Sequence, residues 1–294
     1  MGTFSEDFKI KKVLPEDNEQ TDIKSVLAQN KKIITFVGAR CNGTSFIVNN
    51  TAELISAAGI DVAVIDATKN KNDYYIFTKN EEKLRLIAEK SIKELKNGFT
   101  GGIKINEHLT VYTAIPGENP ENEQIEQILE TLVKKYSLVL IDCDFDTPLK
   151  YFEYSEQIYL IQSMNVLAIQ PLTEFIYKMK NESKLDESKL RIVLNKSLKL
   201  DSITEKEIIG GTAFYNDPTA SYMQQLFNKE NIKFIKIPFD QDAYREYLDS
   251  IARCELNVKA FPIKFIQNLK ELCEYIYPFV RYWTCTQNMK NYIV

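Results

Sequence analysis

The sequence predicts an α/β fold with a doubly wound, mostly parallel sheet that carries helices on both faces. Two observations support this prediction. Short apolar runs, typical of buried strands, alternate with segments of helical periodicity. The first apolar run, residues 33–37, leads directly into a glycine-containing loop that opens a helix. Sheets of this type bind ligands at the carboxyl ends of their strands, so the residues at those ends are the candidates for function.

Seven strands are predicted from short runs of apolar, mostly β-branched residues that end at a polar or turn residue. The first is followed by Gly38, and later ones end at Asp66, Asp142 and Asn195. In chain order the predicted strands cover residues 33–37, 61–65, 109–112, 137–141, 158–161, 190–194 and 232–237.

Helices are predicted where apolar residues repeat every three or four positions, as in the run from Ile125 to Val133. Asp217 followed by Pro218 is typical of an N-cap and a first helical residue. In chain order the predicted helices cover residues 44–58, 80–96, 121–135, 172–180 and 217–227, and residues 242 to about 276 are predicted to be helical. The predicted domain extends over residues 32–278. Residues 1–31 are expected to form a flexible polar leader, with a short helix near 22–29, and residues 279–294 a tail.

Composition excludes several classes of function. The net charge of −4 over 294 residues argues against a general nucleic-acid coat. His108 is the only histidine, so neither a histidine-based metal site nor a Ser-His-Asp triad is expected. The five cysteines show no C-x-x-C spacing, which predicts reduced thiols in a cytoplasmic protein. The sequence has no signal-peptide pattern and no apolar run of 18 residues.

The loop after the first predicted strand has the frame of a phosphate-binding loop, G-x-x-x-x-G-K-[ST], with Thr44 in place of the lysine. In such loops backbone N–H groups hold phosphate oxygens, and a hydroxyl such as that of Ser45 binds Mg²⁺. Losing the lysine removes a charge-assisted bond of about 1.5–3 kcal/mol, so phosphate affinity drops by roughly one to two decades. Phosphoryl transfer suffers more, because it depends on electrostatic stabilisation. A turn that binds nothing is the alternative. The predicted cofactor-binding residues of the loop are Gly38, Arg40, Asn42, Gly43, Thr44 and Ser45.

Four further candidates lie at strand ends. Asp142 follows the run 137–141 and is placed to hold Mg²⁺ together with Ser45, or else to cap the segment near Pro148. Asp66 either orients an attacking water or holds a turn. Asn195 either recognises a base edge or is a polar strand end, and Pro238 is the last candidate for cofactor binding. Asp66 and Asp142 are the predicted catalytic residues, Ser45 and Asp142 the predicted metal ligands, and ATP or ADP with Mg²⁺ the expected cofactor.

Over roughly residues 32–250 the sequence resembles the partition and site-determining ATPases of the ParA/MinD group, which have a deviant Walker A loop. The resemblance rests on four runs in the family's order: KKIITFVGARCNGTSFIVNNTAELISAAGIDVAVID, YSLVLIDCD, RIVLNK and IKIPFD. It is closest to the divergent branch of TadZ/CpaE-type localisation proteins, in which threonine also replaces the loop lysine. The resemblance implies a P-loop NTPase fold of the SIMIBI class.

Position by position, the resemblance makes Asp142 the Walker B aspartate and Asn195 the adenine-recognising residue. Asp66 matches the first aspartate of the family's D-x-D switch, while Thr68 replaces the second. Ala39 stands where the family has its signature lysine. Three charges that phosphoryl transfer uses are therefore absent.

These departures predict a degenerate ParA/MinD-like nucleotide-binding protein with weak or absent ATP hydrolysis. It is expected to act as a homodimeric positioning or assembly factor, with a protein partner, for a secretion, pilus, conjugation or DNA-partition system. Direct DNA binding is not indicated by the charge. Membrane contact through the aromatic run 275–283 is not expected, because Pro278 interrupts it. Two alternatives remain: an active ATPase in which Arg40 or a partner's cation replaces the lysine, and a structural partner whose pocket binds nothing.

Overall fold

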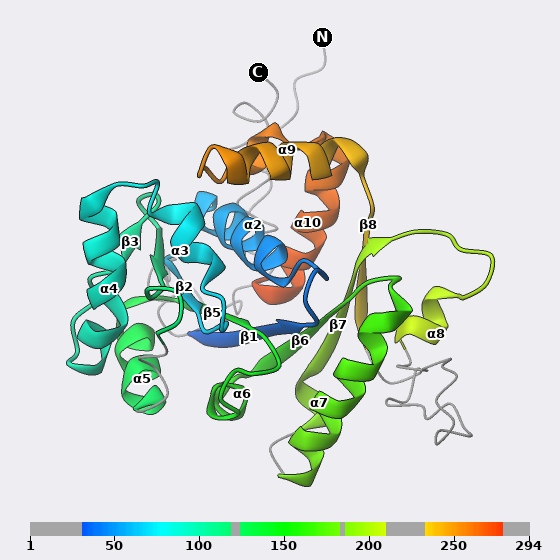
Figure 1. Cartoon of the computed structure of the whole chain (residues 1–294), viewed down its shortest axis with the longest axis horizontal. Coiled ribbons are helices and arrows are strands. Elements are labelled where there is room, and N and C mark those ends of the chain that lie inside the picture. Colours follow the sequence, from blue (N-terminus) through cyan, green and yellow to red (C-terminus); the bar gives the residue numbers. More distant parts are fainter. Residues whose placement is uncertain (1–30, 119–123, 183–185, 210–232, 279–294) are drawn as a thin grey trace, which may run out of the picture.

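A computed structural model of the chain describes residues 31–118, 124–182, 186–209 and 233–278 (Figure 1). The predicted leader helix near 22–29, the predicted helix 217–227 and the tail from 279 onward lie outside these residues. The described elements form an eight-stranded, mostly parallel sheet with helices on both faces, which confirms the predicted fold class.

The sheet has the strand order β3-β4-β2-β5-β1-β6-β7-β8. Every neighbouring pair is parallel except β3 and β4. Strand β3 was not predicted, because two residues carry no periodic pattern. The strands are β1 (Lys32–Gly38), β2 (Val62–Asp66), β3 (Ile103–Lys104), β4 (Leu109–Tyr112), β5 (Leu138–Cys143), β6 (Gln157–Gln162), β7 (Leu190–Ser197) and β8 (Phe234–Pro238).

Strand β1 lies in the middle of the sheet, between β5 and β6. The chain leaves β1 toward β2 on one side, and it leaves β5 toward β6 on the other. The carboxyl ends of β1 and β5 are therefore the point where the winding direction changes, which is where open α/β sheets bind ligands.

The helices cover the sheet in two layers (Figure 1). One layer consists of α2 (Thr44–Ala57), α3 (Asn72–Phe77), α9 (Gln241–Ala252) and α10 (Ile263–Ile276). The other consists of α5 (Ile125–Lys135), α6 (Lys150–Tyr154), α7 (Ile169–Asn181) and α8 (Glu205–Ile209). Helix α4 (Glu82–Lys96) contributes to both apolar cores, through Ala88 to the first and through Ile92 and Leu95 to the second.

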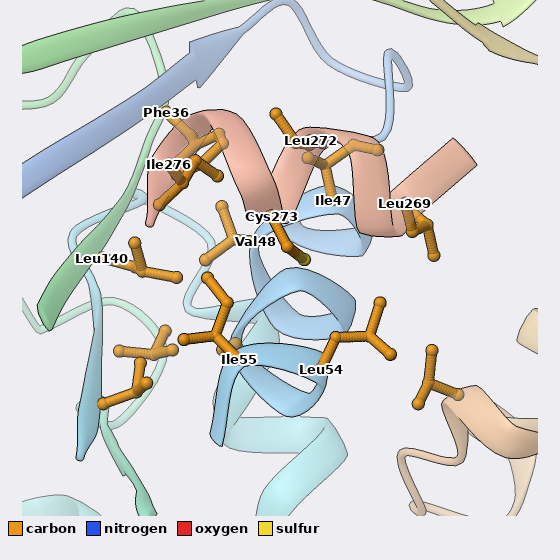
Figure 2. Packing of buried hydrophobic residues seen from close by; sticks show 14 of the residues in the cluster. Phe36, Ile47, Val48, Leu54, Ile55, Leu140, Leu269, Leu272, Cys273 and Ile276 are labelled. Atoms are coloured by element: carbon orange, nitrogen blue, oxygen red, sulfur yellow. The ribbon is translucent and has the colours of Figure 1, made fainter. Parts of the chain in front are cut away.

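The helix that begins at the glycine loop, α2, is held by apolar packing on two sides (Figure 2). Its buried side chains lie between α10 and the sheet. Burying one side chain of this size stabilises the fold by about 1.5–3 kcal/mol, so this packing holds in place the helix that begins at the glycine loop. The labelled residues of this cluster are Ile47, Val48, Leu54 and Ile55 of α2, Leu269, Leu272, Cys273 and Ile276 of α10, and Phe36 and Leu140 of the sheet.

The region predicted to be helical, residues 242–276, is helical in two parts. Two helices, α9 and α10, occupy it, and residues 253–262 separate them. Cys254 has φ 53°, in the left-handed region, and Pro262 is extended immediately before α10 begins. Proline disfavours a helical conformation at the residue before it, so Pro262 was the available signal. Helices α3, α6 and α8 were also missed, since five or six residues are too few for a periodic pattern.

Candidate functional site

Gly38 and Gly43 give the loop between β1 and α2 its shape. A Cβ atom on Gly38 would lie 2.7 Å from the backbone oxygen of Ile161. Gly43 has φ +89°, and a Cβ atom on it would lie 2.5 Å from the side-chain nitrogen of Asn195. Both positions therefore require glycine, and the loop packs tightly against the ends of β6 and β7.

Hydrogen bonds from polar side chains hold the outer side of this loop, which is the side that faces β6 and β7. Asn42 is buried and donates from Nδ2 to the Ile161 oxygen, while its Oδ1 accepts from Ser163. Asn195 donates from Nδ2 to the Asn42 carbonyl at 2.8 Å, and Lys196 donates from Nζ to the Cys41 carbonyl at 2.9 Å. Two loop carbonyls are thus satisfied from β7. Sequence reasoning did not single out Lys196, which no motif of the predicted loop marks.

The inner side of the loop faces a cleft of about 550 Å³. Thr44 and Ser45 line it, at the positions that the loop frame assigns to phosphate and Mg²⁺. Arg40 is exposed at its edge and donates to Asn70 Oδ1 at 3.2 Å. Among the described residues, Arg40 is the only basic side chain that lines this cleft.

Asp142 lies at the carboxyl end of β5 and lines the same cleft. The residue is fully buried, and within the described part of the chain neither carboxylate oxygen accepts a hydrogen bond of normal geometry. Burial raises the pKa of Asp142 well above its usual value; the charges of Asp66 and Asp73 add to the rise, and the Ser45 hydroxyl offsets part of it. A buried carboxylate without a donor is costly, and a cation beside it would remove that cost. The alternative role of Asp142, a cap near Pro148, is not what the structure shows, because Asp144 accepts the turn hydrogen bonds there.

Asp66, also fully buried, does not line the cleft. One carboxylate oxygen accepts from the backbone and hydroxyl of Thr68, and the other accepts from the backbone of Asp73 and the hydroxyl of Thr113. Both oxygens are therefore occupied by the turn that follows β2. Of the two hypotheses for Asp66, this geometry favours the one in which Asp66 holds the turn and does not orient an attacking water.

The polar segment after Asp66 contains two charged side chains that the fold buries, Lys71 and Asp73. Lys71 is fully buried, and its Nζ donates to the Asp66 carbonyl at 2.9 Å. Asp73 is fully buried as well, with Oδ1 bound to Asn49 at 2.6 Å. Burial raises the pKa of Asp66, and the charge of Lys71 offsets part of this rise; burial and then the charge of Asp66 raise the pKa of Asp73 well above its usual value. No motif marks Lys71 or Asp73, although charged residues close after a strand-end aspartate were a visible signal.

A second, smaller pocket adjoins the loop on its outer side, with a volume of about 40 Å³. Asn195 and Pro238 line it, as the sequence prediction requires of residues at one ligand site. Aromatic side chains complete its walls, namely Phe46, Phe239, Tyr244, Tyr247 and Phe265. Most of the predicted residues thus line either the cleft or this pocket, and Gly43 lines both, whereas Asn42 and Asp66 line neither.

The Gly43–Asn195 contact gives a stability prediction. Gly43→Ala forces a left-handed alanine against the Asn195 amide, whereas Gly98→Ala meets nothing within 4 Å at a similar φ of +85°. Gly98→Ala is expected to lower the free energy of unfolding by about 1–2 kcal/mol through backbone conformation alone. Gly43→Ala is expected to cost about 1–3 kcal/mol more, because the loop must shift. Urea unfolding of both variants measures the difference, and equal losses would show that Asn195 does not hold the loop.

Two absences bear on what the site can bind. Among the described residues, no group of three or more His, Cys, Asp or Glu side chains is placed to hold a metal ion alone. Mg²⁺ is commonly held by one or two protein oxygens together with ligand phosphates, so this does not conflict with Ser45 and Asp142. His108, the single histidine, bonds Asp61 Oδ1 at 2.8 Å and lines neither the cleft nor the smaller pocket.

No described helix is long and apolar enough to cross a lipid bilayer.

Solved structures of ParA/MinD-type ATPases have this fold. A ParA family ATPase from Chlorobium tepidum superimposes with a TM-score of 0.61 at 16% identity, covering 83% of this chain and 98% of that one. A putative plasmid partition protein from Borrelia burgdorferi, bound to AMPPNP, gives 0.60 at 17% identity, covering 84% and 99%. The septum site-determining protein MinD from Pyrococcus horikoshii, complexed with Mg-ADP, gives 0.58 at 14% identity, covering 86% and 98%. No protein-family model and no curated protein sequence matches the chain.

Proposed function

We propose that this chain, which has the fold of the ParA/MinD ATPases, is a cytoplasmic positioning or assembly factor that binds an adenine nucleotide, dimerises, and hydrolyses the nucleotide weakly or not at all. The observation that carries the proposal is the loop between β1 and α2. Its glycine frame and the hydrogen bonds of Asn42 and Asn195 that hold it support phosphate binding, while Thr44 stands in place of the charge on which phosphoryl transfer depends.

The phosphates would lie in the larger cleft, over the backbone N–H groups of residues 39–45 and the start of α2. Mg²⁺ would be held by the Ser45 hydroxyl and the Asp142 carboxylate. These hard oxygen ligands suit Mg²⁺, and within the described residues the carboxylate accepts no hydrogen bond of normal geometry. The nucleotides recorded in two structures of this fold, AMPPNP and Mg-ADP, support the same ligand class.

The base would lie in the smaller pocket, against Pro238. Asn195 gives one N–H of its side-chain amide to the Asn42 carbonyl, so its oxygen and its second N–H remain for a ligand. An amide oxygen accepts from an exocyclic amino group such as the one on adenine. This pairing favours an adenine nucleotide.

Weak turnover follows from the residues that would have to support it. Thr44 carries no charge, and the oxygens of Asp66 are occupied by the turn rather than directed at the cleft. The presence of Arg40 at the cleft favours the rival hypothesis of a working ATPase. It is a cation at the cleft, although it bonds Asn70 in this conformation.

The dimer would form over the open side of the cleft. Apolar side chains gather at this rim: Tyr75 is 60% exposed and Ile251 37%, and both line the cleft. Leu248, 48% exposed, continues the surface along α9. A second copy placed here would cover these side chains and close the cleft over the nucleotide. A surface that forms only on dimerisation would then recruit the protein partner of the positioned assembly.

Nucleotide-dependent dimerisation tests this proposal. Sedimentation with Mg²⁺ and a non-hydrolysable ATP analogue is expected to show a dimer for the wild-type chain and a monomer without nucleotide. Tyr75→Asp is expected to remain monomeric under both conditions, because it buries a charge in the interface. Phe99→Asp, at an equally exposed aromatic residue outside the cleft, is the matched control and should dimerise normally. A monomer with nucleotide present, or equal behaviour of both variants, would contradict the proposal.

A further inference from the structure

Helix α3 carries part of the exposed rim of the cleft, although it is too short to be stable by itself. It has six residues, and isolated helices shorter than about 12 residues are marginal in water. Tyr75 and Ile76 of this helix line the cleft, with Tyr75 60% exposed and Ile76 buried. Lys71, the residue before the helix, has a left-handed φ of 50° and provides no side-chain cap. The position of this part of the rim therefore depends on the contacts that α3 makes with the rest of the fold.

Asp73 provides two of these contacts from the first turn of α3. Its backbone N–H donates to Asp66 Oδ2 at 3.1 Å, which ties the helix to the end of β2. Its Oδ1 accepts from Asn49 Nδ2 at 2.6 Å, which ties the helix to α2. Both side chains are buried, and their other oxygens, Asn49 Oδ1 and Asp73 Oδ2, have no hydrogen-bond partner within the described residues. A buried pair that leaves two oxygens unsatisfied adds little net stability, so its main effect is to fix the position of α3.

The face of α2 that carries Asn49 also carries Ser45. The two residues are four positions apart in the helix, so their side chains are neighbours on one face. Ser45 lines the cleft, at the position that the loop frame assigns to Mg²⁺. Asn49 lies one turn further along and bonds Asp73. A continuous series of contacts therefore leads from the cleft, through one turn of α2, to α3 and its exposed Tyr75.

We propose that Asn49 is a positioning residue for the dimer surface: its bond to Asp73 ties α3 to the helix of the phosphate loop, so that nucleotide and Mg²⁺ bound at Ser45 hold Tyr75 where a second copy docks. The inference rests on the proposed function. Without this bond the nucleotide would still reach its loop, because Asn49 lines neither the cleft nor the smaller pocket. Dimerisation, however, would then carry the additional free-energy cost of ordering α3.

The test separates dimerisation from nucleotide binding. Sedimentation with Mg²⁺ and a saturating non-hydrolysable ATP analogue gives the dimer dissociation constant, and titration of a fluorescent ATP analogue at low protein concentration gives the nucleotide affinity. Asn49→Leu removes the donor at similar volume and is expected to weaken the dimer roughly tenfold, while nucleotide affinity changes less than about twofold. Asp73→Ala removes the acceptor and is expected to have the same effect. Asp73→Asn keeps an oxygen for the Asn49 amide and should dimerise within about twofold of the wild type.

Asn50→Leu is the matched control. Asn50 is buried in the same helix, but it donates to the Phe46 carbonyl within α2 and not to α3. Its loss perturbs α2 without releasing α3, so the variant is expected to dimerise like the wild type. If Asn49→Leu does not fold, the comparison of Asp73→Ala with Asp73→Asn decides the test.

Each other outcome is recognisable. Wild-type dimer affinity in folded Asn49→Leu and Asp73→Ala variants would overturn the inference and leave the proposed function standing. Equal losses in Asn50→Leu or in Asp73→Asn would also overturn it, because they would reduce Asn49 to a general support of the fold. A wild-type chain that stays monomeric with nucleotide and Mg²⁺ would contradict the proposed function, and the inference with it.

Discussion

Thr44→Lys is expected to tighten nucleotide binding by about one to two decades. The side chain of residue 44 lines the cleft above the start of α2, so a longer residue can extend toward bound phosphates. A charge-assisted bond contributes about 1.5–3 kcal/mol, which corresponds to that change in affinity. Titration of a fluorescent ATP analogue measures the effect.

Thr44→Met is the control for Thr44→Lys, since it adds a long side chain without the charge and should leave affinity near that of the wild type. Unchanged affinity in a folded Thr44→Lys variant would mean that this cleft does not hold phosphates. A gain with methionine equal to that with lysine would assign the effect to packing instead of charge.

Asp142→Asn is expected to stabilise the protein at neutral pH and to abolish the effect of Mg²⁺ on nucleotide binding. The pKa of Asp142 is raised in the folded state, so the folded chain holds a proton that the unfolded chain releases. The wild type is therefore favoured at low pH and loses stability as the pH rises from the unfolded pKa of about 4 toward the folded pKa. An uncharged asparagine avoids this loss.

The stability gap between Asp142→Asn and wild type is thus expected to be small near pH 4 and to widen by up to about 1.4 kcal/mol per pH unit above it. Urea unfolding across this range measures the gap. Asp146→Asn, at an exposed carboxylate close in sequence, is the matched control and should show no such widening. A gap that does not change with pH would contradict the assignment of a costly buried charge to Asp142.

The fold was predictable because its signals are local. Every predicted strand within the described residues matches one in the sheet to within three residues at either end, since each is a compact apolar run. The glycine loop could also be recognised, because a Cβ atom at position 38 or 43 would clash with neighbouring atoms and only glycine lacks one. What the pattern missed were elements without a period: the two-residue β3 and the short helices α3, α6 and α8.

The site was less predictable, because its decisive contacts join distant parts of the chain. Asp66 and Asp142 look alike as strand-end aspartates, yet both oxygens of Asp66 accept hydrogen bonds, while within the described residues those of Asp142 accept none of normal geometry. Only the packed structure distinguishes them. Lys71 lies in a polar run of the sequence, yet the folded turn buries it and its Nζ bonds the Asp66 carbonyl. Lys196 reaches Cys41 across a separation of 155 residues, which no motif records.

The most direct test of the central claim, nucleotide binding without efficient turnover, is one titration followed by one assay. The wild-type chain is titrated with a fluorescent ATP analogue and Mg²⁺, and phosphate release is then measured with ATP at saturation. The account predicts saturable binding with phosphate release no greater than that of an Asp142→Ala control. Release clearly above that control would contradict it and favour an ATPase that uses Arg40 or a partner's cation, and no binding at millimolar nucleotide would leave a structural partner.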